Sequence, residues 1–537
     1  MSLDFSYKKF LIIDDFGEFR SSLRRMLQSF GAMDIDDATN GEAAIELITN
    51  KPFEIILCDY NLGYNRKDGQ QVLEEIRHRD LIKFSTVFMM ITAENSMQMV
   101  MGAVEYQPDD YLIKPFTREV LKTRLERALR KKSDFEFIER AIGNKEYLRA
   151  IALCDSQIQK IPRNIFEYLK LKGDLCVTIG DYQAAQAVYD KVLSVRDIAW
   201  AKLGMGKVHY YLEDYAAAAD IFRSLVEENS MYIEAYDWLS RTLVAQQALE
   251  EAQRVLMTAA ELSPKSIFRH KTIGEISYKI NDLDTSEKSY KKAINLGQYS
   301  YFKHPSNYTG LAKVLVEKKD PDTALDILKE VRTEFRDNPD ASLQAAAMEG
   351  VVFKEMDRPE EAKKAIQEAM QLMETASGGI SEDIAISLAK TCFELGNKEA
   401  GTRLVQQLIR NNHEDEGLIK KVQEVFKDTQ LEREGDSIIS AARREIIQTN
   451  NQGVRLVEEG RLEEAIEYFE KAANSLRGNK IINANAAQAL LMFIQKNGKD
   501  DQLLQRARQY IERVGKLDPA YNKHRTLLSM YERLIAG

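Results

Sequence analysis

A chain of 537 residues, 44% hydrophobic and 30% charged, has the composition of a globular protein built from several domains or from one repeat array. Its net charge of −9 gives no basic excess to offset phosphate, which argues against nucleic-acid binding as its main activity. No apolar run approaches the roughly 20 residues that a membrane helix needs, so we expect a cytoplasmic protein without membrane insertion. The 4 cysteines are widely spaced and form no CxxC pair, which indicates neither a disulfide framework nor a zinc site.

Apolar runs and amphipathic stretches alternate along residues 8–132. Strands that alternate with helices of this length predict parallel βαβ units in a doubly wound α/β sheet of five strands. The predicted strands are Phe10–Asp14, Met33–Thr39, Glu54–Asp59, Ser85–Thr92 and Asp110–Pro115. The predicted helices run from the first strand to Phe30, around Gly41–Ile48, Gly69–Arg79 and Ser96–Tyr106, and over Arg118–Lys132.

Polar residues stand where four of these strands end. They are Asp14 and Asp15 on the first strand, Asp59 on the third, Thr92 on the fourth and Lys114 on the fifth. The carboxyl ends of parallel strands meet at one edge of the sheet, where ligands gather. Three carboxylates there would repel one another, and Mg²⁺ suits a site with few carboxylates and several waters. One carboxylate can then attack a phosphoryl group, with a lysine and a hydroxyl stabilising the phosphoryl oxygens.

These residues, in this order, resemble the receiver domains of two-component response regulators. The resemblance implies that Asp59 is the phosphoacceptor and that a sensor histidine kinase is its phosphodonor. It also implies a Mg²⁺ site made by Asp14, Asp15, Asp59 and the backbone carbonyl of Asn61.

The same resemblance assigns roles to the last strand ends. Thr92 is similar to the switch hydroxyl, Lys114 to the lysine that pairs with the phosphate, and Tyr111 to the aromatic residue whose rotamer reports phosphorylation. The bond between Lys114 and Pro115 is expected to be cis. One departure is the loop Tyr60–Gly69, which is longer than the family pattern and lacks its proline.

A different period follows Lys132, where no strand pattern continues. Small residues recur at steps of 33, 34, 34, 38 and 38 residues, by subtraction, at Ala185, Ala218, Ala252, Ser286, Ala324 and Ala362. A large apolar or aromatic residue follows four positions later, at Tyr189, Phe222, Leu256, Tyr290, Leu328 and Ile366. A second small residue stands twelve positions before each small residue of the first set, at Gly173, Gly206, Ser240, Gly274, Ala312 and Gly350.

This spacing resembles the tetratricopeptide repeat, a helix–turn–helix of about 34 residues. The small residues let the two helices of a repeat approach, and the large residue fills the space beside them. Pro264 and Pro519 stand where that family places its closing proline. We expect a receiver domain over residues 1–132 and, over 133–537, an array of about nine or ten helix pairs. The repeat register is irregular near 411–445, where we expect either a diverged repeat or a helical insertion.

Tetratricopeptide arrays present a concave surface to other proteins. Tyr210 and Tyr278 share one position on the first helices of their repeats, and Lys207 and Arg241 share another, so all four are candidate partner-binding residues. The alternative is that the tyrosines only pack between repeats. The chain has no Gly-rich phosphate loop and no GxSxG motif, so we expect a phosphoacceptor and not an enzyme.

The sequence thus predicts a phosphorylation-controlled response regulator whose output is binding of an unidentified protein partner through the repeats. One alternative is a phosphate sink or inhibitor that acts on a sensor kinase or on another response regulator. Another is a constitutive scaffold in which the receiver is a dimerisation module. A homodimer is therefore one of the alternative oligomeric states. No basic helix-turn-helix follows the receiver, which argues against a transcription factor.

Overall fold

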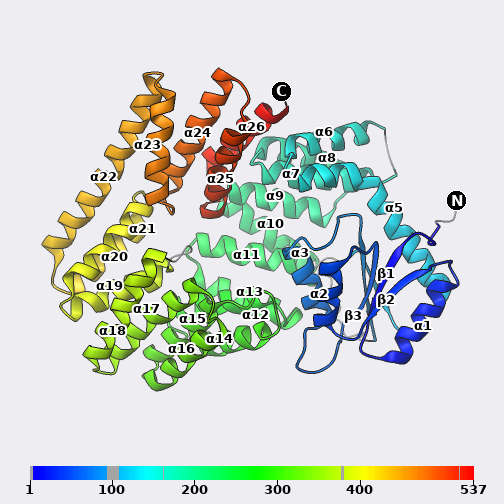
Figure 1. Cartoon of the computed structure of the whole chain (residues 1–537), viewed down its shortest axis with the longest axis horizontal. Coiled ribbons are helices and arrows are strands. Elements are labelled where there is room, and N and C mark those ends of the chain that lie inside the picture. The colour runs from blue at the N-terminus through cyan, green and yellow to red at the C-terminus, as the bar shows by residue number, and fades with distance from the viewer. Residues whose placement is uncertain (1–3, 94–107, 161–162, 376–379, 519–520, 537) are drawn as a thin grey trace. The chain divides into compact units, whose positions relative to one another are not determined.

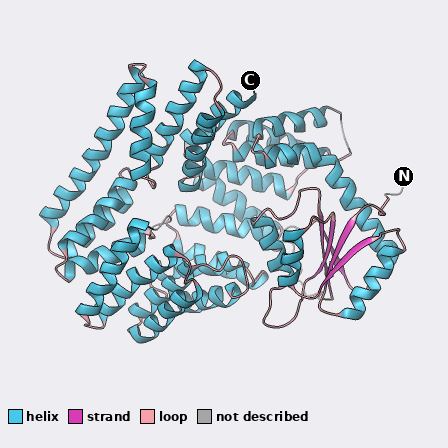
Figure 2. Cartoon of the chain, in the orientation of Figure 1, coloured by secondary structure: helices cyan, strands magenta, loops and turns pink. Residues whose placement is uncertain are grey.

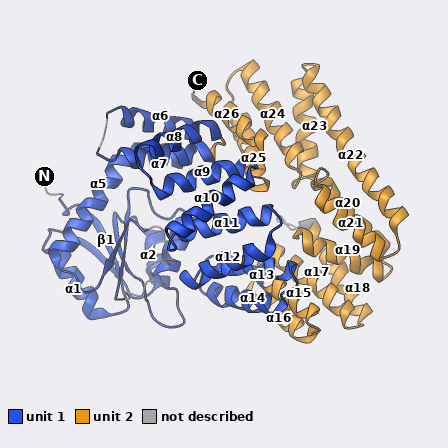
Figure 3. Ribbon diagram, turned by 180° about the vertical axis from the view of Figure 1, so that it is seen from behind, with its two compact units in different colours: residues 1–177, 182–307 blue, residues 178–181, 308–537 orange. Residues whose placement is uncertain are grey.

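The computed structural model describes residues 4–93, 108–160, 163–375, 380–518 and 521–536 (Figure 1). The helix predicted over Ser96–Tyr106 and the proline predicted to close the last repeat, Pro519, lie outside these ranges. Within them, no helix has the length and apolar character that crossing a membrane requires. The chain divides into two compact units, residues 1–177 with 182–307 and residues 178–181 with 308–537 (Figure 3).

A parallel sheet lies at the N-terminus (Figure 2). Its strands are β1 (Lys9–Ile13), β2 (Asp34–Ala38), β3 (Ile55–Asp59), β4 (Val87–Thr92) and β5 (Asp110–Ile113). They are ordered β2-β1-β3-β4-β5, and every neighbouring pair is parallel. This confirms the predicted doubly wound α/β domain with five strands.

Both faces of the sheet are buried, because side chains alternate along a strand and helices cover each side. The helices are α1 (Gly17–Gln28), α2 (Gly41–Asn50), α3 (Gly69–His78) and α5 (Arg118–Gly143). On β3, Ile56 and Cys58 pack with residues of α2 and α3, whereas Ile55 and Leu57 pack with residues of α1 and α5. Because both faces of the sheet are buried, the strands are almost continuously apolar in sequence.

Helix α5 runs without a break from the receiver sheet into the first repeat. The helix predicted to end at Lys132 continues to Gly143, across the predicted boundary between the receiver and the array. Lys132, midway along α5, forms an ion pair of 2.8 Å with Asp109 and lies 4.2 Å from the ring centre of Phe84. The middle of α5 is therefore tied to the sheet domain, whereas Phe135 and Ile138 in its second half pack with α6 and α7.

Glu139 on this helix provides a test by pH. Burial raises the pKa of its carboxyl group from 4.5 to about 7; Lys132 opposes the rise and Asp109 adds to it. The folded chain therefore binds more protons than the unfolded chain between these values, so stability falls as the pH rises through that interval. We expect Glu139→Gln to stabilise the protein at pH 8 by on the order of 1 kcal/mol, since partial exposure screens the effect.

Thermal unfolding at pH 5 and pH 8 checks this expectation. Glu136→Gln changes an exposed carboxylate on the same helix and is the matched control. A gain for Glu139→Gln that is equal at both pH values would contradict the expected ionisation.

The rest of the described chain is helical, as predicted. In the first unit the helices are α6 (Tyr147–Gln159), α7 (Ile165–Thr178), α8 (Tyr182–Val195), α9 (Ala199–Tyr211), α10 (Tyr215–Glu228), α11 (Ile233–Ala245), α12 (Leu249–Leu262), α13 (Ile267–Lys279) and α14 (Leu283–Gly297). Next come α15 (Pro305–Glu317), α16 (Pro321–Glu334), α17 (Pro339–Glu355), α18 (Pro359–Thr375), α19 (Glu382–Glu394) and α20 (Lys398–Asn411). The last helices are α21 (Glu416–Asp428), α22 (Glu432–Glu458), α23 (Leu462–Ser475), α24 (Lys480–Asn497), α25 (Asp501–Leu517) and α26 (Asn522–Ala536).

The periodic small residues lie where the two helices of a pair meet. The six residues of the first set, from Ala185 to Ala362, are all fully buried. A Cβ atom added to Gly206 would lie 2.5 Å from the ring of Phe222, and one added to Gly173 would lie 2.5 Å from the ring of Tyr189. The large side chain thus occupies the space that the missing side chain leaves.

The turn between paired helices repeats as well. Among the described residues, eleven successive turns each have one residue with a positive φ: Lys145, Gly180, Glu213, Gln247, Asn281, Lys319, Asp357, Gly396, Gln430, Gly460 and Gly498. This conformation lets an amide after the turn cap the end of the first helix. For example, the amide of Asp214 donates to the carbonyl of His209 at 3.0 Å. The turn at Gln430 falls inside the irregular stretch, between α21 and the 27-residue helix α22.

Gly206 tests this packing. We expect Gly206→Ala to lower stability by about 1–3 kcal/mol, because the added methyl group overlaps the buried ring of Phe222. Gly143→Ala is the matched control, since an added Cβ there meets no atom within 4 Å. Urea or thermal unfolding measures both, and equal stabilities would contradict the assigned register.

Candidate functional site

The polar strand ends predicted from the sequence meet at one edge of the sheet. Asp14 directly follows β1, Asp59 and Thr92 are the last residues of β3 and β4, and Lys114 directly follows β5. The register brings them together, because Ile13 is paired with Cys58, and Asp59 with Ile91. The edge therefore contains carboxylates, a hydroxyl and an ammonium group.

Lys114 joins two of the carboxylates. Its Nζ lies 2.8 Å from Oδ2 of Asp14 and 3.0 Å from Oδ2 of Asp59. It also lies 3.8 Å from the ring centre of Phe19, a contact that sequence reasoning missed because an aromatic residue on an amphipathic helix carries no such signal. Asp14 is buried and Asp15 is exposed, so the site opens to solvent on one side.

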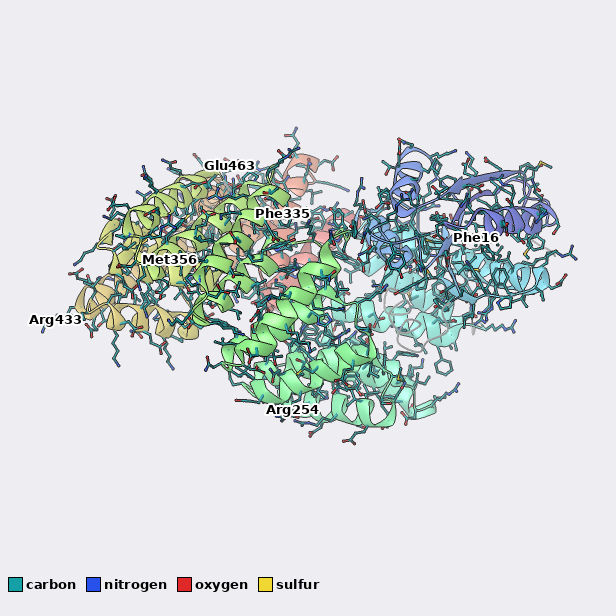
Figure 4. All side chains as sticks on the ribbon, turned by 90° about the horizontal axis from the view of Figure 1, so that it is seen from below. Phe16, Arg254, Phe335, Met356, Arg433 and Glu463 are labelled. Carbon is teal, nitrogen blue, oxygen red and sulfur yellow. The ribbon has the colours of Figure 1, made fainter. Side chains whose placement is uncertain are left out.

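Backbone amides orient the two bridged carboxylates. The amide of Phe16, labelled in Figure 4, donates to Oδ1 of Asp14 at 2.8 Å. The amide of Tyr60 donates to Oδ1 of Asp59 at 2.9 Å. Each carboxylate thus has one oxygen bonded to the main chain and the other bonded to Lys114, which leaves little freedom of rotation.

The electrostatics suit a divalent cation. Oxygen atoms of Asp14, Asp15 and Asp59 all lie within 4.8 Å of one another, close enough to hold a metal ion. Burial raises the pKa of Asp59 to about 6; Lys114 opposes this rise, and the nearby charge of Asp14 adds to it. One ammonium does not balance three carboxylates, and oxygen-rich sites of this kind fit Mg²⁺. The donor set therefore fits the predicted metal.

The start of α3 packs directly on the end of β3. A Cβ atom added to Gly69 would lie 2.1 Å from the carbonyl oxygen of Asp59, so only glycine fits here. The amide of Gly69 donates to the carbonyl of Tyr60 at 2.9 Å. Asp68 caps α3 by accepting from the amide of Gln71 at 2.9 Å. The Asp-Gly pair in the sequence was a turn signal that could have located this contact.

The remaining receiver candidates lie around the same edge. Thr92 is buried, and Asn61 is exposed with its side-chain oxygen accepting the amide of Gly63 at 3.2 Å. Tyr111 on β5 is half-buried, pairs in register with Met90 and packs beside the α2–α3 core. The bond from Lys114 to Pro115 is cis, as expected.

Three of the four repeat candidates surround Trp238. Lys207 lies 5.3 Å from the Trp238 ring and pairs with Glu234 at 2.7 Å, while the guanidinium of Arg241 lies 4.6 Å from the same ring. Tyr210 meets Trp238 edge to face at 5.4 Å. Tyr278 is on α13, two repeats further along the chain than Tyr210 on α9.

Both parts of the chain match known protein families. Residues 10–126 match the response regulator receiver domain, residues 272–390 match the tetratricopeptide repeat-like domain, and residues 167–197 and 451–475 match the tetratricopeptide repeat. The chain is 29% identical over 119 residues to Chemotaxis protein CheY of Pseudomonas aeruginosa, which spans 22% of this chain and 94% of that protein. It has the same identity over 119 residues to Chemotaxis protein CheY-3 of Vibrio cholerae serotype O1, with 22% and 89% covered.

A solved structure of MamA from Desulfovibrio magneticus RS-1, residues 41 to the end, is similar to part of this chain. It shares 23% sequence identity and covers 30% of this chain and 91% of its own, with a TM-score of 0.27.

The sheet order and the acidic strand ends define a receiver-type α/β domain. Together with the family matches, they show that the chain consists of an N-terminal response regulator receiver domain followed by tetratricopeptide repeats. Both resemblances drawn from the sequence are confirmed.

The acidic cluster leads to a test with metal. At ten times its Kd, Mg²⁺ should stabilise the folded protein by about 1.4 kcal/mol, because it binds the assembled carboxylates and not the unfolded chain. Asp14→Asn should abolish this gain. Asp34→Asn, which changes an exposed aspartate on β2, should retain it. Thermal unfolding with and without MgCl₂ measures the effect, and a full gain in Asp14→Asn would place Mg²⁺ elsewhere.

Proposed function

We propose that this protein is a cytoplasmic response regulator of a two-component system. A sensor histidine kinase phosphorylates Asp59 of the receiver, residues 1–132, and the array over residues 133–537 binds another protein in response. The observation that carries the proposal is the Asp14–Lys114–Asp59 bridge beside Asp15 on a receiver fold. The repeats support a binding output, since arrays of this type present extended surfaces to proteins.

The chemistry proposed for Asp59 is a phosphoryl transfer. A carboxylate oxygen of Asp59 attacks phosphorus, the bond from phosphorus to the donor imidazole nitrogen breaks, and an aspartyl phosphate forms. Asp14, Asp15, Asp59 and the backbone carbonyl of Asn61 would hold Mg²⁺, which would neutralise charge on the phosphoryl oxygens when bound. Lys114 moves its hydrogen bond from the Asp59 carboxylate to the phosphoryl group.

Two residues then report the new state. The Thr92 hydroxyl hydrogen-bonds the phosphoryl group. Tyr111, on the neighbouring strand, then changes its rotamer. Because β4 and β5 are adjacent and α5 leaves the sheet directly after β5, a shift there reaches the first repeat without a flexible linker. This continuity favours a coupled output over a phosphate sink or a constitutive scaffold.

Labelling with a small acyl phosphate tests the phosphoacceptor. With acetyl phosphate and Mg²⁺, the wild type should shift on a phosphate-affinity gel, and Asp59→Asn should show no shift because its amide is not a nucleophile. Asp34→Asn is the control and should shift fully. A mobility shift that persists in Asp59→Asn would contradict the assignment of Asp59 as the phosphoacceptor. Removal of Mg²⁺ should abolish labelling of the wild type.

The output has its own test. The group around Trp238 presents Arg241 as an exposed cation, so Arg241→Ala should weaken partner capture, whereas Arg254→Ala, exposed on α12 and labelled in Figure 4, should not. Capture with and without beryllofluoride on Asp59 separates the alternatives. Partners that bind equally in both states would support the scaffold, and capture of a kinase or another response regulator alone would support the sink or inhibitor.

A further inference from the structure

Within the first compact unit, the repeat region supplies a lysine to the border of the receiver site. Lys265, in the turn between α12 and α13, places Nζ 2.9 Å from Oδ2 of Asp68. The same Nζ lies 4.5 Å from the ring centre of Tyr60. Tyr60 directly follows Asp59, and Asp68 directly precedes Gly69, whose backbone packs on Asp59. Lys265 therefore contacts both ends of the loop that follows Asp59.

This contact is shielded from water. The Lys265 side chain is 29% exposed, that of Asp68 is 21% exposed, and Tyr60 is almost fully buried. Burial alone would lower the pKa of Lys265, but the Asp68 charge and the Tyr60 hydroxyl outweigh it and raise the pKa. A charge pair removed from water in this way is costly to break, because either partner alone would remain buried without compensation.

A polar face of α3 continues the contact. Gln70, Gln71, Glu74, Glu75 and His78 share one side of the helix, three or four residues apart. Gln70, Glu74 and Glu75 are nevertheless buried. Burying such groups without hydrogen bonds would be unfavourable. The receiver satisfies part of this need itself, because the Tyr60 hydroxyl donates to Oε1 of Gln70 at 3.2 Å and Lys67 pairs with Glu75 at 2.8 Å. The repeat region adds further partners.

The C-terminal end of α14 and the segment between α14 and α15 provide the matching groups. Ser300 donates from Oγ to Oε2 of Glu74 at 3.0 Å, and Nε2 of Gln71 donates to the carbonyl of Leu296 at 3.2 Å. Lys67 donates to the carbonyl of Tyr299 at 2.8 Å. The ring of His78 lies 4.8 Å from that of Tyr301. Hydrogen bonds between particular groups thus define the contact between α3 and the repeats.

We propose that Lys265 is a positioning residue for the phosphoacceptor, and that phosphorylation of Asp59 and docking of α3 on the repeats are thereby coupled. This rests on the proposed function of Asp59. The path is short: Lys265 holds Tyr60 and Asp68, the Tyr60 amide holds the Asp59 carboxylate, and Gly69 packs on the Asp59 carbonyl. Such coupling is reciprocal for equilibria, so phosphorylation must alter the α3 contact as that contact alters phosphorylation.

The first experiment measures the rate of labelling by acetyl phosphate in the full chain. Lys265→Met should slow it by roughly five-fold or more, as should Asp68→Asn, and the double variant should be no slower than either one. Lys265→Arg should recover most of the rate, since it restores the charge. Lys291→Met, which removes an exposed lysine of α14, is the control and should behave as wild type.

A wild-type rate for Lys265→Met, or an equal loss in Lys291→Met, would overturn the inference. Failure of the proposed function has a different signature, since Asp59→Asn would then still be labelled.

The second experiment needs no variant. Hydrogen exchange of the wild type, with and without beryllofluoride and Mg²⁺, should change in residues 262–272 and 296–302 as well as around Asp59. Protection that changes only in the receiver would overturn the coupling even if the variants failed to fold.

Discussion

The receiver depends on the balance of charge at one edge of its sheet. A parallel sheet brings strand ends together, so three carboxylates are forced within a few ångströms of one another whenever the fold forms. The Lys114 ammonium offsets part of that repulsion by bonding Asp14 and Asp59 at the same time. Because it is shared, the lysine is also free to change partners without leaving the site, which is the property that a phosphoryl-transfer site needs.

The repeats rely on a different constraint, that of space. A buried ring in one helix occupies the gap left by a glycine or other small residue in the helix before it, as with Phe222 and Gly206. The turn that follows requires a positive φ, which most side chains adopt only at a cost. Several turns nevertheless carry Glu213, Gln247 or Asn281 there, so the hydrogen bonds that end the first helix outweigh this local strain.

The sequence predicted those parts of the protein whose residues obey a local period. Asp14, Asp59 and Thr92 could be placed because each ends an apolar run in an alternating pattern, and parallel strands have only one edge for such residues. The array could be placed because the same spacing recurs. Equivalent register did not mean a shared location, however. Lys207, Tyr210 and Arg241 meet at Trp238, whereas Tyr278 stands on α13, two repeats further along the chain than Tyr210.

Contacts between distant segments had no such signal. Lys265 and Asp68 are 197 residues apart, and neither stands out in its own surroundings. Periodicity describes what one element does and carries no information on which surface another element covers. The polar face of α3 had the pattern of an ordinary solvated helix side, and only the fold shows that it is buried.

The unbroken course of α5 affects how this chain can be divided. A fragment that stopped at the end of the receiver would cut a helix through its middle, near the Lys132–Asp109 ion pair, and would lack Phe135 and Ile138, which pack with α6 and α7. It would also remove the hydrogen-bond partners that Ser300 and Leu296 supply to Glu74 and Gln71. An isolated receiver is thus a different physical object from the receiver in the intact chain.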